Sequence, residues 1–182
     1  MSLSARIFRS ACAPLTGLIL VFMAGANVAH SQSAAAGCVL ERVGGTSRML
    51  LRCPDGLTII VEAGARFSLI DRNRDGNADA ARLQRKALLL NAPAGQAETG
   101  FQVITPQAIA AVRGTKWAVD VQDGKTSVFV VRGRVAVQRP SARAGVLLGP
   151  GDGVDVAPGS DPLVVKRWPR ARVSALLARF GQ

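Results

Sequence analysis

The chain has 182 residues, of which 48% are hydrophobic and 19% are charged, and its formal net charge is +11. This length suits one globular domain, and apolar residues recur along the whole chain, which excludes a mainly disordered protein. Nineteen glycines and nine prolines are spread through the sequence and exclude a coiled coil.

The first 31 residues have the three parts of a secretory signal peptide. Arg6 and Arg9 form the positive region, residues 15–23 form a short apolar region, and residues 29–31 offer a small-residue cleavage pattern. The alternative is an uncleaved anchor, but the apolar run is shorter than the roughly 20 residues that span a bilayer. We therefore expect an exported, periplasmic protein whose mature chain contains no transmembrane helix.

Removal of residues 1–31 would take away His30 and Cys12, and it would lower the formal charge from +11 to +9, because two basic and no acidic residues are lost. A chain without histidine cannot form a Ser-His-Asp or Cys-His catalytic arrangement or a histidine-ligated zinc site. The two remaining cysteines, Cys38 and Cys53, are fifteen positions apart, and in an oxidising compartment they predict a disulfide. The alternative is two unpaired thiols in a frayed N-terminus.

The body of the chain is predicted to be all-β, because turn signals recur about every ten residues between short segments rich in Val, Ile, Leu and Thr. Strands are expected at residues 48–53, 57–61, 67–70 and 83–90, the last of which is also compatible with a helix. An antiparallel meander with turns at 123–124 and 132–133 is expected from residues 115–121, 127–131 and 134–138. The pattern leaves open a barrel, a sandwich or a solenoid built from these short strands.

The tail predicts a short amphipathic helix at residues 170–180. Its apolar side chains recur at helical spacing and are Val173, Leu176, Leu177 and Phe180. We interpret it as a helix that caps an open end or edge of the β body, with a membrane-surface helix or a partner-docking helix as alternatives. The expected domains are a signal peptide (1–31), a lead-in (32–44), a β domain (45–160) and a helical cap (161–182).

A series of motifs begins at Phe101. In chain order they are a Thr-Pro strand (101–106), an Arg-Gly-Thr followed by an aromatic (110–117), an Asp-Gly-Lys-Thr turn (123–126), a Val-rich hairpin (128–137) and a glycine turn (145–151). This succession resembles the FecR periplasmic domain family, and the resemblance extends over roughly residues 45–160. It implies an all-β module without catalysis that binds a ligand or protein partner in envelope sensing.

FecR-type proteins join a cytoplasmic anti-sigma segment, one transmembrane helix and a periplasmic β domain. This sequence departs from that plan, because it opens with an apparent signal peptide and shows no anti-sigma segment. We therefore expect a stand-alone exported form of the periplasmic module.

Four residues of the Arg-Gly-Thr motif are the candidate binding residues: Arg113, Gly114, Thr115 and Trp117. One interpretation is structural, in which Gly114 marks a bulge and Trp117 is the main core aromatic. The other is a recognition surface lined by Arg113.

Residues 71–79 follow the pattern D-x-N-x-D-G-x-x-D and resemble a calcium loop. The oxygen ligands would be Asp71, Asn73, Asp75, Asn77 and Asp79, with Gly76 at the turn. Arg82 stands at the twelfth position, where calcium loops carry an acid. The alternative is an Asx-rich turn. Calcium is thus the one cofactor that the sequence suggests.

The excess of arginine favours anionic partners, although a GC-rich genome alone can also produce it. No nucleic-acid module is recognisable, and aromatic residues are too few for single-strand binding. We expect a non-enzymatic module that binds an envelope protein. The alternative is a surface-associated protein that binds an anionic envelope polymer through its arginines.

Overall fold

The computed structural model describes residues 37–44, 48–93 and 100–182. The expected signal peptide lies outside these ranges, as do residues 32–36 of the expected lead-in. Within the described residues the strands are β1 (Val39–Arg42), β2 (Met49–Arg52), β3 (Thr58–Val61), β4 (Arg66–Ile70), β5 (Ala80–Asn91), β6 (Phe101–Ile104), β7 (Ile109–Gln122), β8 (Lys125–Gln138), β9 (Gly145–Leu148), β10 (Asp152–Val156) and β11 (Lys166–Arg167). The helix α1 spans Arg170–Ala178.

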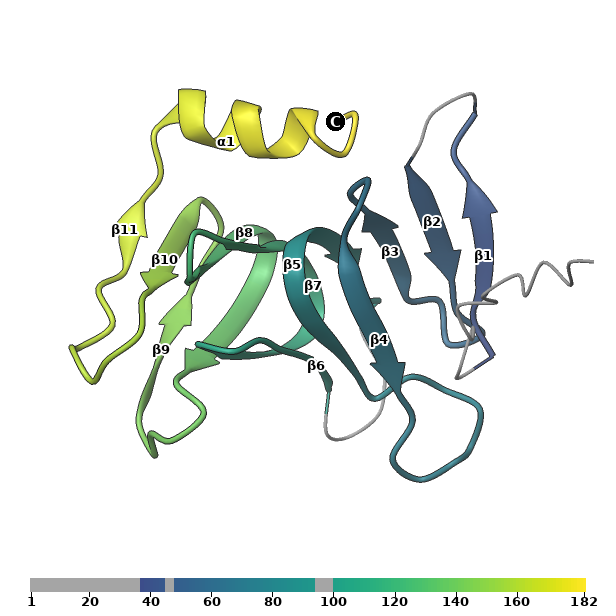
Figure 1. The fold of residues 1–182 in the computed structure, drawn as a ribbon, viewed down its shortest axis with the longest axis horizontal. Helices are drawn as coiled ribbons and strands as arrows, with labels where there is room; N and C mark the ends of the chain where they lie inside the picture. The colour runs from purple at the N-terminus through teal and green to yellow at the C-terminus, as the bar shows by residue number, and fades with distance from the viewer. Residues whose placement is uncertain (1–36, 45–47, 94–99) are drawn as a thin grey trace, which may run out of the picture. The chain divides into compact units, whose positions relative to one another are not determined.

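These strands form one open sheet rather than a closed barrel (Figure 1). The main path runs β1-β2-β3-β5-β6-β7-β8-β10-β11, with β4 paired to β5, β9 paired to β8, and a further pairing of β5 with β7. All pairings are antiparallel except that of β5 with β6. The all-β prediction is confirmed, and residues 83–90 belong to a strand rather than a helix.

The expected meander is two long strands rather than three short ones. β8 continues through residues 132–133, where a turn was predicted, and pairs with β7 along almost its whole length. Gly114 and Gly133 both have positive φ, and a Cβ on Gly133 would lie 2.8 Å from the Gly114 carbonyl oxygen. Glycine therefore lets the two backbones bulge together without ending either strand.

The two faces of the sheet carry different apolar clusters. The larger cluster includes Trp117, Val119, Val128 and Val130, all fully buried, and it forms the core. This confirms the alternation predicted for residues 115–121, in which Lys116 and Asp120 point to the opposite face. Burial on this scale is the main source of stability for the sheet.

A disulfide joins Cys38 to Cys53, with an S–S distance of 2.04 Å, and confirms the predicted pairing. It connects the residue before β1 to the residue after β2. In the chain-entropy account, closing a loop of this length stabilises the fold by about 3 kcal/mol.

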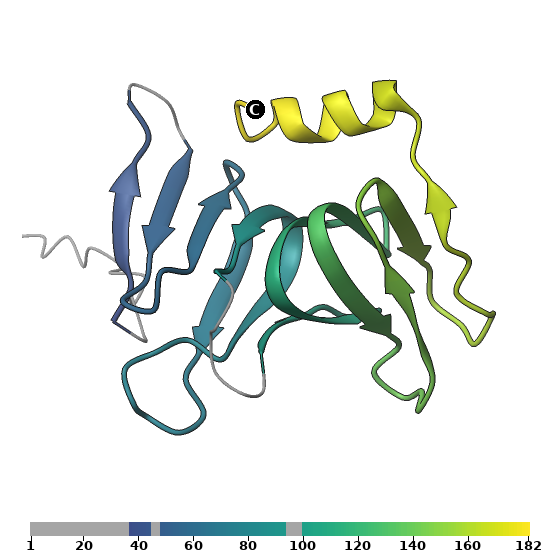
Figure 2. The ribbon, with the colours of Figure 1, turned by 180° about the vertical axis from the view of Figure 1, so that it is seen from behind.

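Helix α1 crosses the other face of the sheet, from the β10–β11 side toward β3 (Figures 1 and 2). Its Leu176 and the following Phe180 are buried against Ala87, Leu89 and Ala118 of the central strands. The helix thus covers part of a sheet face rather than an end or edge, because its apolar stripe needs a broad apolar surface. Pro169 precedes its first turn, where the fixed φ of proline suits the start of a helix.

Candidate binding site

The four residues of the Arg-Gly-Thr motif do not form a common surface. Thr115 and Trp117 are completely buried, and the Thr115 hydroxyl donates a hydrogen bond to the Arg113 carbonyl oxygen at 2.9 Å. Trp117 packs against Phe101 with ring centroids 6.3 Å apart, as expected for a core aromatic. Arg113 is the exposed member, so only this residue is placed to meet a partner. The binding role of the motif stays a prediction.

The register around the bulge brings cations together that are far apart in the sequence. Arg113 lies opposite Arg134, and Lys116 lies opposite Arg132. Like charges directly opposite each other on neighbouring strands are destabilising. Two such pairs on one hairpin make this part of the sheet favourable to anions.

The face of the sheet that carries α1 is organised in three rows that run across the strands. The register places Ala87 of β5, Asp120 of β7, Ser127 of β8 and Asp155 of β10 side by side, with Glu62 next to Ala87. We call Glu62, Asp120 and Asp155 the acidic row. The next row contains Ile60, Leu89, Ala118 and Phe129, and we call it the apolar row. The third contains Thr58, Asn91, Lys116 and Arg132, and we call it the basic row.

Arg179, just after α1, binds two members of the acidic row. Its guanidinium donates to Asp120 Oδ2 at 2.6 Å and to Glu62 Oε1 at 3.1 Å. Glu62 also accepts a hydrogen bond from the Ala87 amide at 2.9 Å. The hydrogen bond to Asp120 is the largest cause that raises the pKa of Arg179 above its usual value, and it prevails over partial burial. Charge-assisted, forked pairs of this kind are the strongest hydrogen bonds in proteins.

Arg172 of α1 binds the third member of the acidic row. It donates to Asp155 Oδ2 at 2.9 Å, and its guanidinium lies 3.5 Å from the ring centre of Trp168. Trp168 in turn stacks on Phe129 at 5.1 Å. Burial raises the pKa of Asp155, but hydrogen bonds from Arg172 and Ser127 outweigh it, so the pKa lies below its ordinary value. The carboxylate is therefore held in its charged form.

Gly153 makes room for this stack. A Cβ at this position would lie 2.4 Å from the indole of Trp168. Only glycine permits such a close approach between the backbone of β10 and the ring.

The basic row borders a groove of about 420 Å³. Thr58, Asn91, Lys116 and Arg132 line it together with Ile60, Leu89, Leu90 and Val131. Lys116 donates to the Gln182 side-chain oxygen at 2.9 Å, and Arg132 donates to the Asn91 side-chain oxygen at 3.1 Å. Both cations thus contact neutral oxygens, and no carboxylate side chain is among the described residues that line the groove.

A bulge in β8 turns Arg132 into this groove. Trp117 pairs with Val130 and Lys116 pairs with Arg132, so Val131 has no partner in β7. A bulge can direct two successive side chains to one face. Strict alternation would have sent Arg132 to the core face, away from Lys116.

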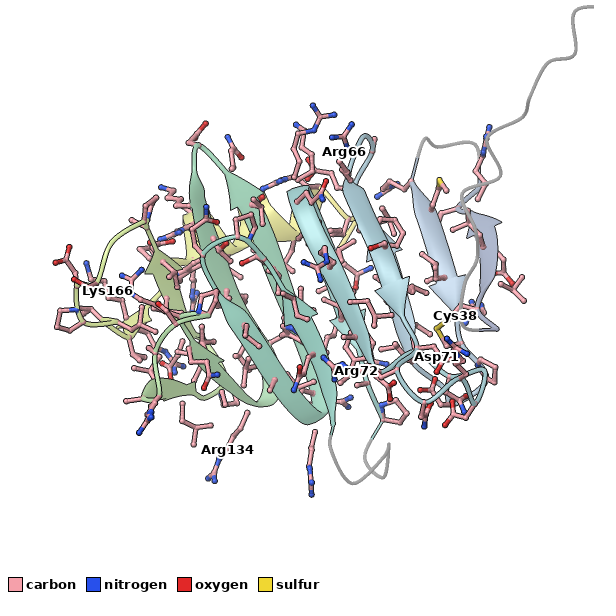
Figure 3. All side chains as sticks on the ribbon, turned by 60° about the horizontal axis from the view of Figure 1, so that its bottom comes forward. Cys38, Arg66, Asp71, Arg72, Arg134 and Lys166 are labelled. Atoms are coloured by element: carbon pink, nitrogen blue, oxygen red, sulfur yellow. A yellow bond between two sulfur atoms is a disulfide. The ribbon has the colours of Figure 1, made fainter. Side chains whose placement is uncertain are left out.

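The expected calcium loop lies between β4 and β5, where Figure 3 labels Asp71 and Arg72. Asp71 accepts hydrogen bonds from the amides of Arg74 at 2.7 Å and Gly76 at 3.0 Å, and Asp75 accepts one from the Asn77 amide at 2.7 Å. This last bond, with one from the Asn73 side chain, lowers the pKa of Asp75. These bonds favour the Asx-rich turn. Asp79 accepts from the Arg72 amide, and a calcium site here stays a prediction.

Within the described residues, no three acidic, histidine or cysteine side chains are grouped to hold a metal ion. The described part of the chain also contains no helix with the length and apolar character needed to span a membrane. The arrangement of rows and groove is suited to recognition by charge and apolar contact.

Sequence reasoning missed Lys116, Arg132 and Asn91 as surface neighbours. The Asp123-Gly124 turn pairs Gln122 with Lys125, and counting outward places Arg113 opposite Arg134. The same count places Lys116 opposite Val131 and fails by one residue at the bulge. Asn91 enters through the pairing of β5 with β7, for which the sequence carries no local signal.

A model described as FecR protein matches residues 40–136, which is more than half of the chain. The chain belongs to the FecR family. The matched residues run from β1 to near the end of β8 and include all of the basic and apolar rows, whereas Asp155 and α1 lie beyond them.

Two crystal structures of a "putative anti-sigma factor" from Parabacteroides distasonis are similar to this FecR-family chain, each with a TM-score of 0.58 and 21% identity. The matches cover 77% and 76% of this chain, which spans 64% of the length of those chains. At this identity the likeness shows the fold. None of the curated proteins compared matches the chain.

Proposed function

We propose that this FecR-family chain is a non-catalytic regulator of cell-envelope signalling that binds a partner protein outside the cytoplasm. The FecR match over residues 40–136 is the observation that carries the proposal. The fold shared with a protein titled a "putative anti-sigma factor" supports a regulatory role. The signal-peptide pattern of residues 1–31 supports export to the periplasm.

The test is cross-linking in the native host, with a tag placed at the C-terminus of the chromosomal copy. We expect the mature chain in the periplasmic fraction, joined to one partner in a constant ratio that persists at high salt. Deletion of the chain should change the transcription of a defined gene set. A cytoplasmic location, or no partner and no transcriptional change, would contradict the proposal.

A second candidate function is binding of an anionic envelope polymer, and two exposed arginine pairs favour it. Arg66 lies opposite Arg85, and Arg113 lies opposite Arg134. Arg66 and Arg134 point away from opposite ends of the sheet (Figure 3). Polymer binding would be lost progressively with added salt and would extend to many polyanions. Binding of one protein that survives high salt would exclude this second function as the main one.

A further inference from the structure

We propose that the groove along the basic row binds an acidic amphipathic segment of the partner polypeptide. The segment would place apolar side chains on Ile60, Leu89 and Val131 and carboxylates beside Lys116 and Arg132. This inference rests on the proposed function and gives it a site.

The first support is the charge of the groove. Lys116 and Arg132 lie directly opposite each other, although like charges in this arrangement destabilise a sheet. Lys116 is half-buried and Arg132 is exposed, and their hydrogen bonds go to neutral side-chain oxygens of Gln182 and Asn91. A carboxylate brought between them would replace this repulsion with charge-assisted hydrogen bonds.

The second support is the apolar floor. Ile60 and Val131 are half-buried and continue the apolar row on which Leu176 and Phe180 rest. The groove of about 420 Å³ has room for a few side chains, and buried apolar anchors surrounded by polar groups dominate the binding energy of interfaces. A simple anion would use the cations and leave this floor exposed.

The third support is α1 itself, which shows how a polypeptide covers this face. We call residues 170–182 the α1 segment. This segment places apolar side chains on the apolar row and arginines on the acidic row. The basic row has the opposite charge and adjoins the same apolar row. A segment that covers it in the same manner must therefore carry acids where the α1 segment carries arginines.

The experiment is a selection of random peptides displayed on phage against the purified protein. We expect enrichment of sequences with Asp or Glu on one helical face and Leu, Val or Phe on the other. A synthetic peptide of the enriched sequence should bind the Lys116→Glu/Arg132→Glu variant about tenfold or more weakly than the wild type by calorimetry. A milder Lys116→Gln/Arg132→Gln variant should show a smaller loss, and circular dichroism should confirm that both remain folded.

The matched control is Arg66→Glu/Arg85→Glu, which changes the net charge by the same amount at an opposed pair on β4 and β5. We expect this variant to bind the peptide nearly as well as the wild type. Equal losses in the two variants would overturn the site and favour general attraction of polyanions. Enrichment of neutral or basic peptides, or no enrichment over the Lys116→Glu/Arg132→Glu variant, would also overturn it.

The outcome is separable from that of the proposed function. If cross-linking in cells recovers a partner whose binding survives Lys116→Glu/Arg132→Glu, the function stands and the groove is not its site. If peptides select as expected but the cells show neither a partner nor a transcriptional change, the groove binds acidic segments and the signalling role fails.

Discussion

The acidic row and the basic row lie on the same face of the sheet, four residues apart along β7 at Asp120 and Lys116, with Ala118 midway between them. The acidic row meets Arg172 and Arg179 from the α1 segment, so its charges are neutralised within the chain. The basic row meets only the neutral oxygens of Asn91 and Gln182 among the described contacts. With the proposed docking, the chain itself covers the acidic half of this face and leaves the basic half to an acidic partner.

The largest loss of stability is expected when Arg179, which neutralises two members of the acidic row, is removed. Arg179→Ala would leave Glu62 and Asp120 charged, each with a side chain only 14% exposed. Removing one partner of a buried ion pair is strongly destabilising, and we expect a loss of about 2–3 kcal/mol in urea unfolding, given the partial exposure. The control is Arg170→Ala on the exposed side of α1, which should stay within about 0.5 kcal/mol of the wild type. Equal effects of the two variants would show that α1 is not fixed through the acidic row.

A smaller effect is expected from Arg172→Ala. Its pair with Asp155 is more than a third exposed and is worth little, but the stack on Trp168 adds a cation–π contact. We expect a loss of about 1 kcal/mol and a change in tryptophan fluorescence, because Trp168 loses the cation over its ring. Arg172→Lys should restore part of the stability and little of the fluorescence, since Lys lacks the planar guanidinium. Unchanged fluorescence in Arg172→Ala would contradict the stack.

The pairing of Asp155 with Arg172 should also become weaker in acid. Because the pKa of Asp155 lies below its ordinary value in the folded chain, Asp155 stabilises the fold above the ordinary aspartate pKa of about 3.9. That stability is lost as the pH falls through the lowered pKa. We expect Tm to fall in this range and Asp155→Asn to be less sensitive to pH. A variant that follows the same pH profile as the wild type would assign the acid sensitivity elsewhere.

The smallest change in stability, and one of opposite sign, is expected from a substitution in the basic row. Arg132→Gln removes one of two opposed cations, so the stability should be unchanged or higher by up to about 0.5 kcal/mol. The comparison therefore predicts that a cation of the α1 segment is needed for stability and a cation of the basic row is not. A loss of more than 1 kcal/mol on this substitution, measured by urea unfolding, would show that the basic row is structural.

Much of this fold could be predicted from local patterns. The alternation in residues 115–121 separates Trp117 from Lys116, the two cysteines left in the mature chain predict the disulfide, and the helical period of the tail predicts α1. Each of these predictions depends on residues that are close in sequence, or on two cysteines that have no other cysteine to pair with in the expected mature chain.

The three rows could not be predicted, because they depend on register between distant strands. β3 pairs with β5, and β5 with β7, through contacts that no turn motif specifies. The bulge at Val131 shifts the one register that could be counted from a turn. From sequence alone Gly133 predicts a turn, because a positive φ is needed in a turn and in a bulge alike. The cluster of cations follows from that bulge.

The most direct test of the account is to map the binding of the enriched acidic peptide by NMR amide shifts. We predict shifts at Thr58, Asn91, Lys116 and Arg132, while the amides of Glu62, Asp120 and α1 keep their positions. Such a result would place the partner on the basic row beside a docked helix. Shifts at the acidic row and throughout α1 would mean that the peptide displaces the helix, and they would contradict the division of the face into a completed half and an open half.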